Sequence, residues 1–125
     1  MRMASLIVLA VLALGGCSQG VQAPTDPGVC WHMVQFAGGK VKFNQLNQNV
    51  PSLEACAAHL ESMRLRFSAL GSNPEQMIGA YQGQFLFLQP EGIFTSQTLD
   101  GAHYLLLVRG PGGRLVKPGV LPPDQ

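Results

Sequence analysis

Hydrophobic and polar positions along the chain follow two different spacings, and these predict the secondary structure. The runs VCWHMVQF and VKFNQL are rich in β-forming residues and flank Gly38 and Gly39, which predicts a β-hairpin. Between residues 53 and 67 the apolar positions recur at helical spacing, so we expect one amphipathic helix. Ser52 is a suitable N-cap for it, and the GSNP sequence at residues 71–74 ends it. The apolar stripe of this helix consists of Leu53, Cys56, Ala57, Leu60, Met63 and Phe67.

The second half of the chain contains β-rich runs separated by turn sequences. MIGAYQGQFLFLQ predicts one long strand, and IFTSQTL, DGAHYLLLVRG and the short RLV predict further strands. The expected fold class is therefore α+β, with an N-terminal β-hairpin, one amphipathic helix and an antiparallel β-meander of three to four strands. We expect a single domain over residues 29–117, followed by a Pro-rich irregular tail over residues 118–125.

Two of these strands are apolar on both faces. In the FLFL run, Phe85 and Phe87 point to one face of the sheet while Leu86 and Leu88 point to the other. Strands of this kind need cover on both sides, and a single helix covers only one. The hairpin, curling of the sheet or another molecule must cover the other face, so this feature points toward a partner.

The N-terminus combines the parts of an export signal. Arg2 precedes a largely apolar stretch of eleven residues at positions 4–14, shorter than the roughly 20 residues that span a bilayer. The LGGC sequence at residues 14–17 resembles the lipobox of small Gram-negative bacterial lipoproteins, and this resemblance covers residues 1–18 only. The open alternative is an ordinary signal peptide that happens to be followed by a cysteine.

The resemblance to lipoproteins implies how the N-terminus is processed. Residues 1–16 would be removed as a signal peptide, and Cys17 would carry lipid that anchors the protein in the membrane. Residues 17–28 would then be the lipidated N-terminus and a flexible tether. The expected location is the cell envelope, and Ser18 suggests the outer membrane, facing the periplasm.

Charge and cysteine content narrow the classes of partner and chemistry. Seven basic and seven acidic residues remain after residue 16, so we expect no nucleic-acid binding. If Cys17 carries lipid, an oxidising periplasm would join Cys30 and Cys56 in a disulfide. Closing a loop of about 27 residues would contribute about 3.5 kcal/mol in the chain-entropy model. The competing interpretation, a metal or redox pair, lacks the C-x-x-C spacing.

Few residues offer a specific chemistry. We find no catalytic motif, and His32, His59 and His103 lack metal-ligand spacing, so no enzyme activity, metal or cofactor is expected. The sequences GAYQGQF and FTSQTLDG place amides and hydroxyls beside aromatic residues. These residues would line a groove for a glycan or an extended peptide: Tyr81, Gln82, Gln84, Thr95, Ser96 and Gln97. The alternative is that they form the solvent-facing side of a hairpin.

These observations favour a membrane-anchored periplasmic lipoprotein that acts as a non-enzymatic protein-interaction module of the cell envelope. The alternative function is an envelope domain that binds a glycan or small ligand in the Tyr/Gln/Thr-lined groove. A small hydrolase would require catalytic residues that converge only in three dimensions.

Overall fold

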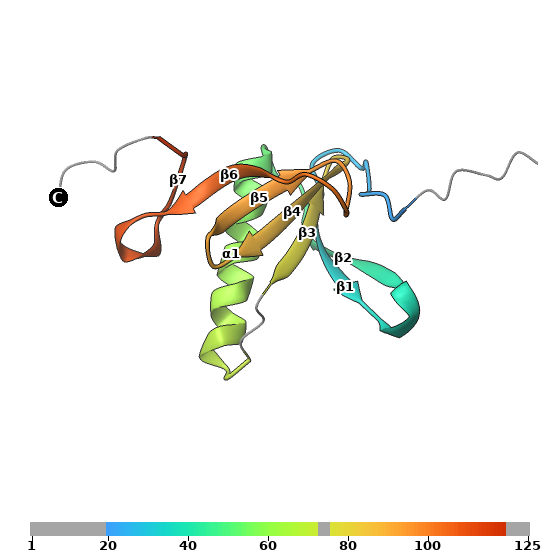
Figure 1. Cartoon of the computed structure of the whole chain (residues 1–125), viewed down its shortest axis with the longest axis horizontal. Coiled ribbons are helices and arrows are strands. Elements are labelled where there is room, and N and C mark those ends of the chain that lie inside the picture. Colours follow the sequence, from blue (N-terminus) through green and yellow to red (C-terminus); the bar gives the residue numbers. More distant parts are fainter. Residues whose placement is uncertain (1–19, 73–75, 120–125) are drawn as a thin grey trace, which may run out of the picture.

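The computed structural model describes residues 20–72 and 76–119 and has the expected α+β class. Within these ranges one α-helix packs on a seven-stranded antiparallel sheet whose strand order is β2-β1-β3-β4-β5-β6-β7 (Figure 1). The helix α1 spans Leu53–Ala69. The strands are β1 (Cys30–Gln35), β2 (Val41–Asn47), β3 (Met77–Tyr81), β4 (Gln84–Gln89), β5 (Gly92–Ser96), β6 (Tyr104–Arg109) and β7 (Leu115–Val116).

The meander is larger than the three to four strands expected from the sequence. Five strands, β3 to β7, follow one another as neighbours in the described part of the chain. The difference arises at Gln82 and Gly83, where the expected long strand folds back on itself. Both residues have positive φ, 44° and 83°, and two consecutive residues of this kind are typical of a tight type I′ hairpin turn. The run MIGAYQGQFLFLQ therefore forms two paired strands, β3 and β4.

The helix begins and ends with local hydrogen bonds that its sequence supplies. The Ser52 hydroxyl accepts a hydrogen bond from the Ala55 amide at 3.1 Å, as expected of an N-cap. At the other end Gly71 has φ of 87°, and the Ser72 amide donates to the Phe67 carbonyl at 2.9 Å. This is a Schellman arrangement, in which glycine adopts the left-handed conformation that other residues avoid.

The apolar stripe of α1 packs against the sheet, as the helical spacing predicted. Cys56 and Leu60 are fully buried, and the predicted disulfide is present, joining Cys30 on β1 to Cys56 with the Cα atoms 5.3 Å apart. Gly79 on β3 allows the helix to approach closely. A Cβ atom at Gly79 would lie 2.3 Å from the Leu60 Cδ1 and 2.6 Å from the Trp31 carbonyl oxygen, so a larger side chain does not fit.

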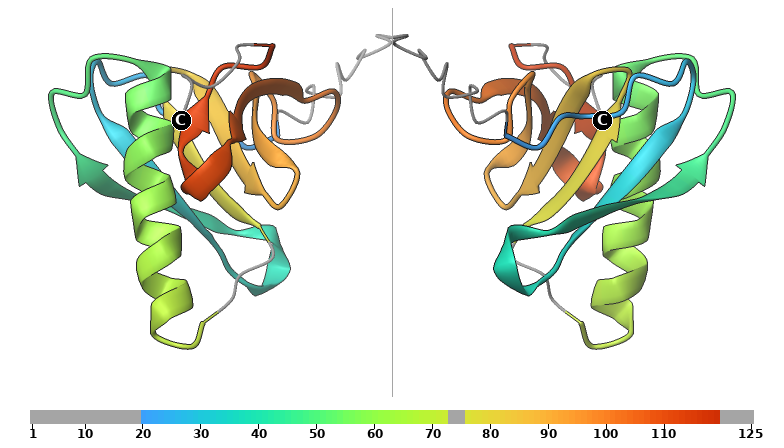
Figure 2. Two further views of the ribbon diagram at one scale, coloured as in Figure 1. Left: turned by 90° about the vertical axis from the view of Figure 1, so that its left-hand side faces the viewer. Right: turned by 90° about the vertical axis from the view of Figure 1, so that its right-hand side faces the viewer.

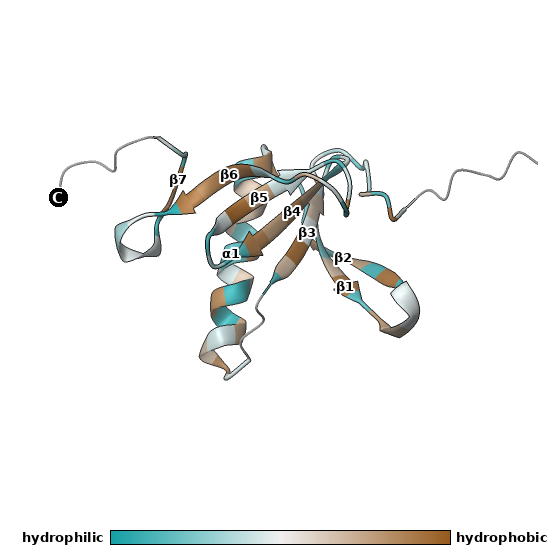
Figure 3. Ribbon diagram, viewed as in Figure 1, coloured by the Kyte–Doolittle hydropathy of each residue, from teal (hydrophilic) through white to brown (hydrophobic). Residues whose placement is uncertain are grey.

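The buried residues form two hydrophobic clusters, one on each face of the sheet. The first lies between the sheet and α1 and includes Leu86 and Leu88 of β4. The second lies on the opposite face and includes Phe85 and Phe87, which are at most 1% exposed. Apolar residues accordingly run along β3, β4 and β5, whereas α1 alternates between apolar and hydrophilic residues (Figure 3).

The second face of the sheet is covered by the chain itself. Two segments supply this cover: residues 21–28, which we call the N-terminal strap, and the loop at residues 97–103. Leu99 of the loop packs against the second cluster, and His103 stacks on Phe87. In the right-hand view of Figure 2 the blue strap crosses the sheet on the side opposite α1. Both apolar faces of β4 are therefore covered by the chain itself.

The N-terminal strap is held by both apolar and polar contacts. Val21 and Ala23 pack on the second cluster, and Ala23 is 7% exposed. The Pro24 carbonyl accepts a hydrogen bond from the Gly83 amide at 2.8 Å, and the Gly28 carbonyl accepts one from the Val50 amide at 2.8 Å. Among the described residues, contacts between the strap and the rest of the domain thus extend as far as Val21.

Candidate functional site

A polar hollow of about 410 Å³ opens at one end of the sheet, over β4, β5 and β6. It is lined by Gln84, Thr95, Ser96, Gln97, Thr98, Ala102 and Tyr104. Four of the six residues that we expected in a groove, Gln84, Thr95, Ser96 and Gln97, line this hollow together. They converge because β4 begins where β5 ends, in adjacent antiparallel strands.

Hydrogen bonds fix the floor of the polar hollow. The Thr95 hydroxyl lies 2.9 Å from the Phe85 carbonyl oxygen and 3.0 Å from Oε1 of Gln84. Ser96 is 6% exposed, and its hydroxyl accepts a hydrogen bond from the Thr98 amide at 3.1 Å, which positions the start of the loop. The Gln84, Thr95 and Ser96 side chains are therefore held in place by hydrogen bonds within the chain.

Tyr104 supplies the aromatic side of the polar hollow. It pairs with Thr95 in the β5–β6 ladder, and it is 67% exposed. None of the described residues that line the hollow is an acid, a lysine, an arginine or a histidine. The arrangement thus offers neutral hydrogen-bonding groups next to an accessible ring, and it suits an uncharged polar ligand.

Tyr81 and Gln82, the other two residues of the expected groove, lie elsewhere. Tyr81 is 5% exposed in the cluster under α1, and its hydroxyl donates to the Val50 carbonyl at 2.5 Å. Gln82 lies in the β3–β4 turn, where its Oε1 accepts a hydrogen bond from the Gly28 amide at 2.7 Å. Both side chains fix neighbouring segments of the chain, and Tyr104 takes the position that the sequence suggested for Tyr81.

His32 and His103 lie on opposite faces of the sheet and do not converge. His32 lies near the Phe67 ring on the helix side, with centroids 6.3 Å apart, and burial lowers its pKa. His103 stacks on Phe87 on the opposite face, with centroids 3.7 Å apart and planes inclined by 16°. Within residues 20–72 and 76–119 there is no group of three His, Cys, Asp or Glu residues that could hold a metal ion.

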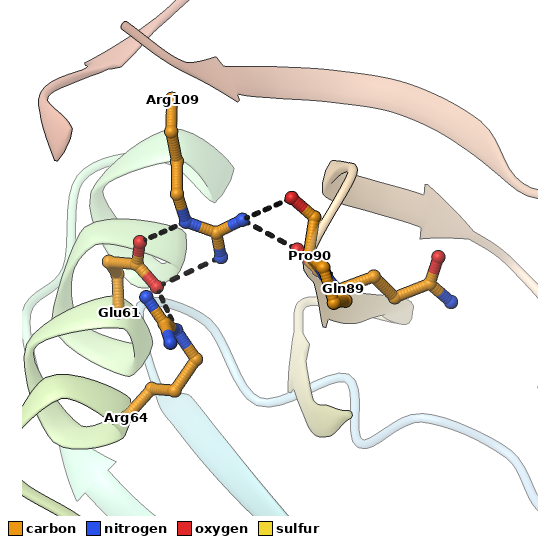
Figure 4. A network of polar contacts seen from close by, with 5 residues as sticks. All are labelled: Glu61, Arg64, Gln89, Pro90 and Arg109. Carbon is orange, nitrogen blue, oxygen red and sulfur yellow. Dashed lines mark hydrogen bonds and ion pairs between the residues drawn. The ribbon is translucent and has the colours of Figure 1, made fainter. Parts of the chain in front are cut away.

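An ion-pair network around the buried Glu61 joins three elements, and sequence reasoning missed it. Arg109 at the end of β6 reaches Glu61 of α1 through Nε (2.5 Å to Oε2) and Nη2 (3.0 Å to Oε1) (Figure 4). Arg64 Nε also donates to Glu61 Oε1 at 2.5 Å. The remaining Nη1 of Arg109 donates to the Gln89 carbonyl at 2.5 Å, so one guanidinium links α1, β6 and the β4–β5 turn.

The charge of Glu61 depends on this network. Burial raises the pKa of the Glu61 carboxyl, but the hydrogen bonds and positive charges of Arg109 and Arg64 outweigh it and bring the pKa down to about 2. The carboxylate is therefore ionised at neutral pH and fully paired. Both arginines bind Glu61, and Arg109 also binds backbone carbonyls, so the network has a structural role. One sequence signal indicates that Glu61 lies against the sheet. Glu61 follows Leu60 and is therefore at the edge of the apolar stripe of α1.

In the part of the chain that the structure describes, no helix is long and apolar enough to cross a membrane. Cys17 and the expected signal peptide lie outside the described residues. Comparison with protein-family models, with curated proteins and with solved structures gave no match.

Proposed function

We propose that this protein is a periplasmic lipoprotein, anchored through Cys17, whose folded domain is a non-enzymatic protein-interaction module of the cell envelope. The LGGC sequence at residues 14–17 supports the anchor. The folded domain supports the binding role because its preformed polar hollow carries an exposed aromatic ring at its rim.

The observation that carries this proposal is the exposure of Tyr104. Tyr104 lies on β6 at the rim of the polar hollow, with 67% of its surface accessible. Tyrosine is enriched at the centres of protein interfaces, where a rigid ring buries a large area and its hydroxyl still finds a hydrogen-bond partner. A partner seated on Tyr104 would also reach the amides of Gln84 and Gln97 in the polar hollow. An extended peptide segment of an envelope protein has the backbone donors and acceptors that match these groups.

Site-specific photo-crosslinking in cells tests the interaction. A photo-crosslinking amino acid replaces Tyr104 in the lipidated protein, and a matched variant carries it in place of Leu70, which is 83% exposed at the end of α1. We expect one dominant envelope protein to be captured from position 104 and not from position 70. A Cys17→Ser variant, which lacks the anchor, should give less of the same product. Equal products from positions 104 and 70 would contradict the assignment of the surface.

A second candidate function is binding of a glycan or small ligand in the same hollow. The neutral hydroxyl and amide lining favours it, because sugar hydroxyls pair with such groups and a sugar ring stacks on an exposed tyrosine. Pull-down with purified peptidoglycan separates the two candidates. Retention that is lost in Tyr104→Ala and in Gln84→Ala, together with no protein captured from position 104, would favour the glycan.

A further inference from the structure

We propose that the end of the domain formed by residues 20–22 and residues 97–100 rests on the bilayer surface, with phospholipid headgroups as its contact. This inference depends on the proposed lipidation of Cys17. It adds an orientation: the polar hollow opens near the membrane, and the C-terminal end of α1 points away from it.

The first step is that the N-terminal strap is part of the folded domain. Its attachment starts at Val21, which packs on the second cluster, and continues through buried Ala23. The Pro24 carbonyl and both backbone groups of Gly28 are hydrogen-bonded to the β3–β4 turn and to Val50. The strap is therefore fixed to the sheet, so the chain between Cys17 and the strap sets how far the sheet can lie from the anchor.

The second step is the length of chain between the anchor and the strap. Three peptide units separate Cys17 from Gly20, and they span at most about 11 Å when fully extended. A domain of about 100 residues has a radius of gyration of about 13 Å, hence a radius of roughly 17 Å. Because the connection is shorter than this radius, the end of the domain that carries Gly20 must stay close to the bilayer.

The third step identifies the surface at that end. A second hollow of about 600 Å³, which we call the N-terminal hollow, is lined by Gly20, Val21, Gln22, Gln97, Thr98, Leu99 and Asp100. Its described lining contains no lysine or arginine, so the lipid on Cys17 and not charge attraction holds it at the membrane. Amide and hydroxyl groups at this surface can exchange hydrogen bonds with water and phospholipid headgroups. In Figures 1 and 2 the strap and the C-terminal end of α1 lie at opposite ends of the molecule.

The orientation limits which partners can reach the polar hollow. Gln97 and Thr98 line both hollows, so the polar hollow adjoins the membrane-facing surface. The partner segment would then be one that lies close to the membrane surface, such as a periplasmic turn of a membrane-embedded protein. A partner that spans the periplasm would instead meet the far end, around Leu70.

Quenching by lipid-bound nitroxide tests the orientation. A fluorescent amino acid replaces Asp100 or, in the matched variant, Leu70, both of which are exposed. The lipidated full-length proteins are reconstituted into vesicles of phosphatidylethanolamine and phosphatidylglycerol that carry a headgroup nitroxide lipid. Because the end of the domain that carries Gly20 lies within about 11 Å of the anchored Cys17, we expect quenching at position 100 to be at least about twofold that at position 70. Equal quenching at the two positions would overturn the orientation while leaving the anchor intact.

Two control proteins separate the orientation from the anchor. An insertion of about 20 Gly and Ser residues after Ser18 gives a connection of about 25 Å, and the difference between positions 100 and 70 should then disappear. A difference that survives this insertion would overturn the argument from connection length. Absence of acyl mass on Cys17, or failure of the native protein to co-sediment with the vesicles, would instead refute the proposed lipoprotein. The Cys17→Ser protein should remain in the supernatant.

Discussion

Replacing Glu61 by Gln should lower stability at neutral pH and leave it unchanged at very low pH. The substitution keeps the shape of the side chain and removes the charge that pairs with Arg109 and Arg64. The pKa of Glu61 falls from 4.5 to about 2 in the folded chain, so the folded state binds this proton less readily than the unfolded state. The stabilisation is therefore fully present above pH 4.5 and is lost as the pH falls toward about 2.

The size of this effect follows from the pKa and from the exposure of the partners. The fall in the Glu61 pKa from 4.5 to about 2 corresponds to about 3.5 kcal/mol, because each pKa unit is worth about 1.4 kcal/mol. The Arg64 and Arg109 side chains keep 23% and 18% of their surface in water, which screens part of the attraction. We therefore expect Glu61→Gln to cost about 2 kcal/mol at pH 7.

Urea unfolding at a series of pH values measures this difference. The unlipidated Cys17→Ser protein serves as the background, with the disulfide intact, and far-ultraviolet circular dichroism follows unfolding. Glu91→Gln is the matched control, because Glu91 is exposed on the β4–β5 turn next to the same network, and it should change stability by less than about 0.5 kcal/mol. A Glu61→Gln difference that stays constant between pH 7 and pH 2, or that is absent at pH 7, would refute the argument.

Three further predictions concern packing, covalent linkage and titration. Gly79→Ala should lower the free energy of unfolding by about 1–3 kcal/mol, because the added Cβ overlaps Leu60 of the helix. Gly20→Ala is the control and should be neutral, because a Cβ at Gly20 meets nothing within 4 Å. Equal effects of the two substitutions in urea unfolding would contradict this. Replacing Cys30 and Cys56 together by Ala should cost about 3.5 kcal/mol in the chain-entropy model, and an unchanged urea midpoint would contradict it. Burial lowers the pKa of His32, so the unfolded chain binds a proton at His32 more readily than the folded chain does. The free energy of unfolding should therefore fall as the pH drops through 6.5. A midpoint at or above 6.5 in an NMR titration of His32 would count against this.

The sequence predicted local structure well where the signal is local. The N-cap at Ser52, the glycine that ends α1 and the apolar stripe all depend on residues within a few positions of one another, and the structure confirms each. The disulfide was also predictable, because two cysteines on facing elements leave few alternatives once Cys17 is assigned to lipid. The predicted number of strands was wrong because the β3–β4 turn at Gln82 and Gly83 was not predicted. This turn requires positive φ at a glutamine, and Gln-Gly is not one of the common hairpin turn sequences.

The candidate site shows where local reasoning reaches its limit. The amide and hydroxyl content of two runs identified Gln84, Thr95, Ser96 and Gln97 as a polar group, and antiparallel pairing brings them together. It did not distinguish which tyrosine accompanies them. Both tyrosines lie on the same face of the sheet, but Tyr81 is buried under α1 whereas Tyr104 lines the hollow. This difference depends on where along the sheet the helix packs.

By itself the sequence determined the α+β class, the helix and its caps, and the cysteine pair, because each is encoded in spacing or in the chemistry of adjacent residues. Only the tertiary structure decided what covers the second face of the sheet and how the strap is attached. It also decided that Arg109 meets Glu61 across 48 positions of sequence. Contacts of this kind depend on how distant segments pack in three dimensions, and no short window of sequence contains that information.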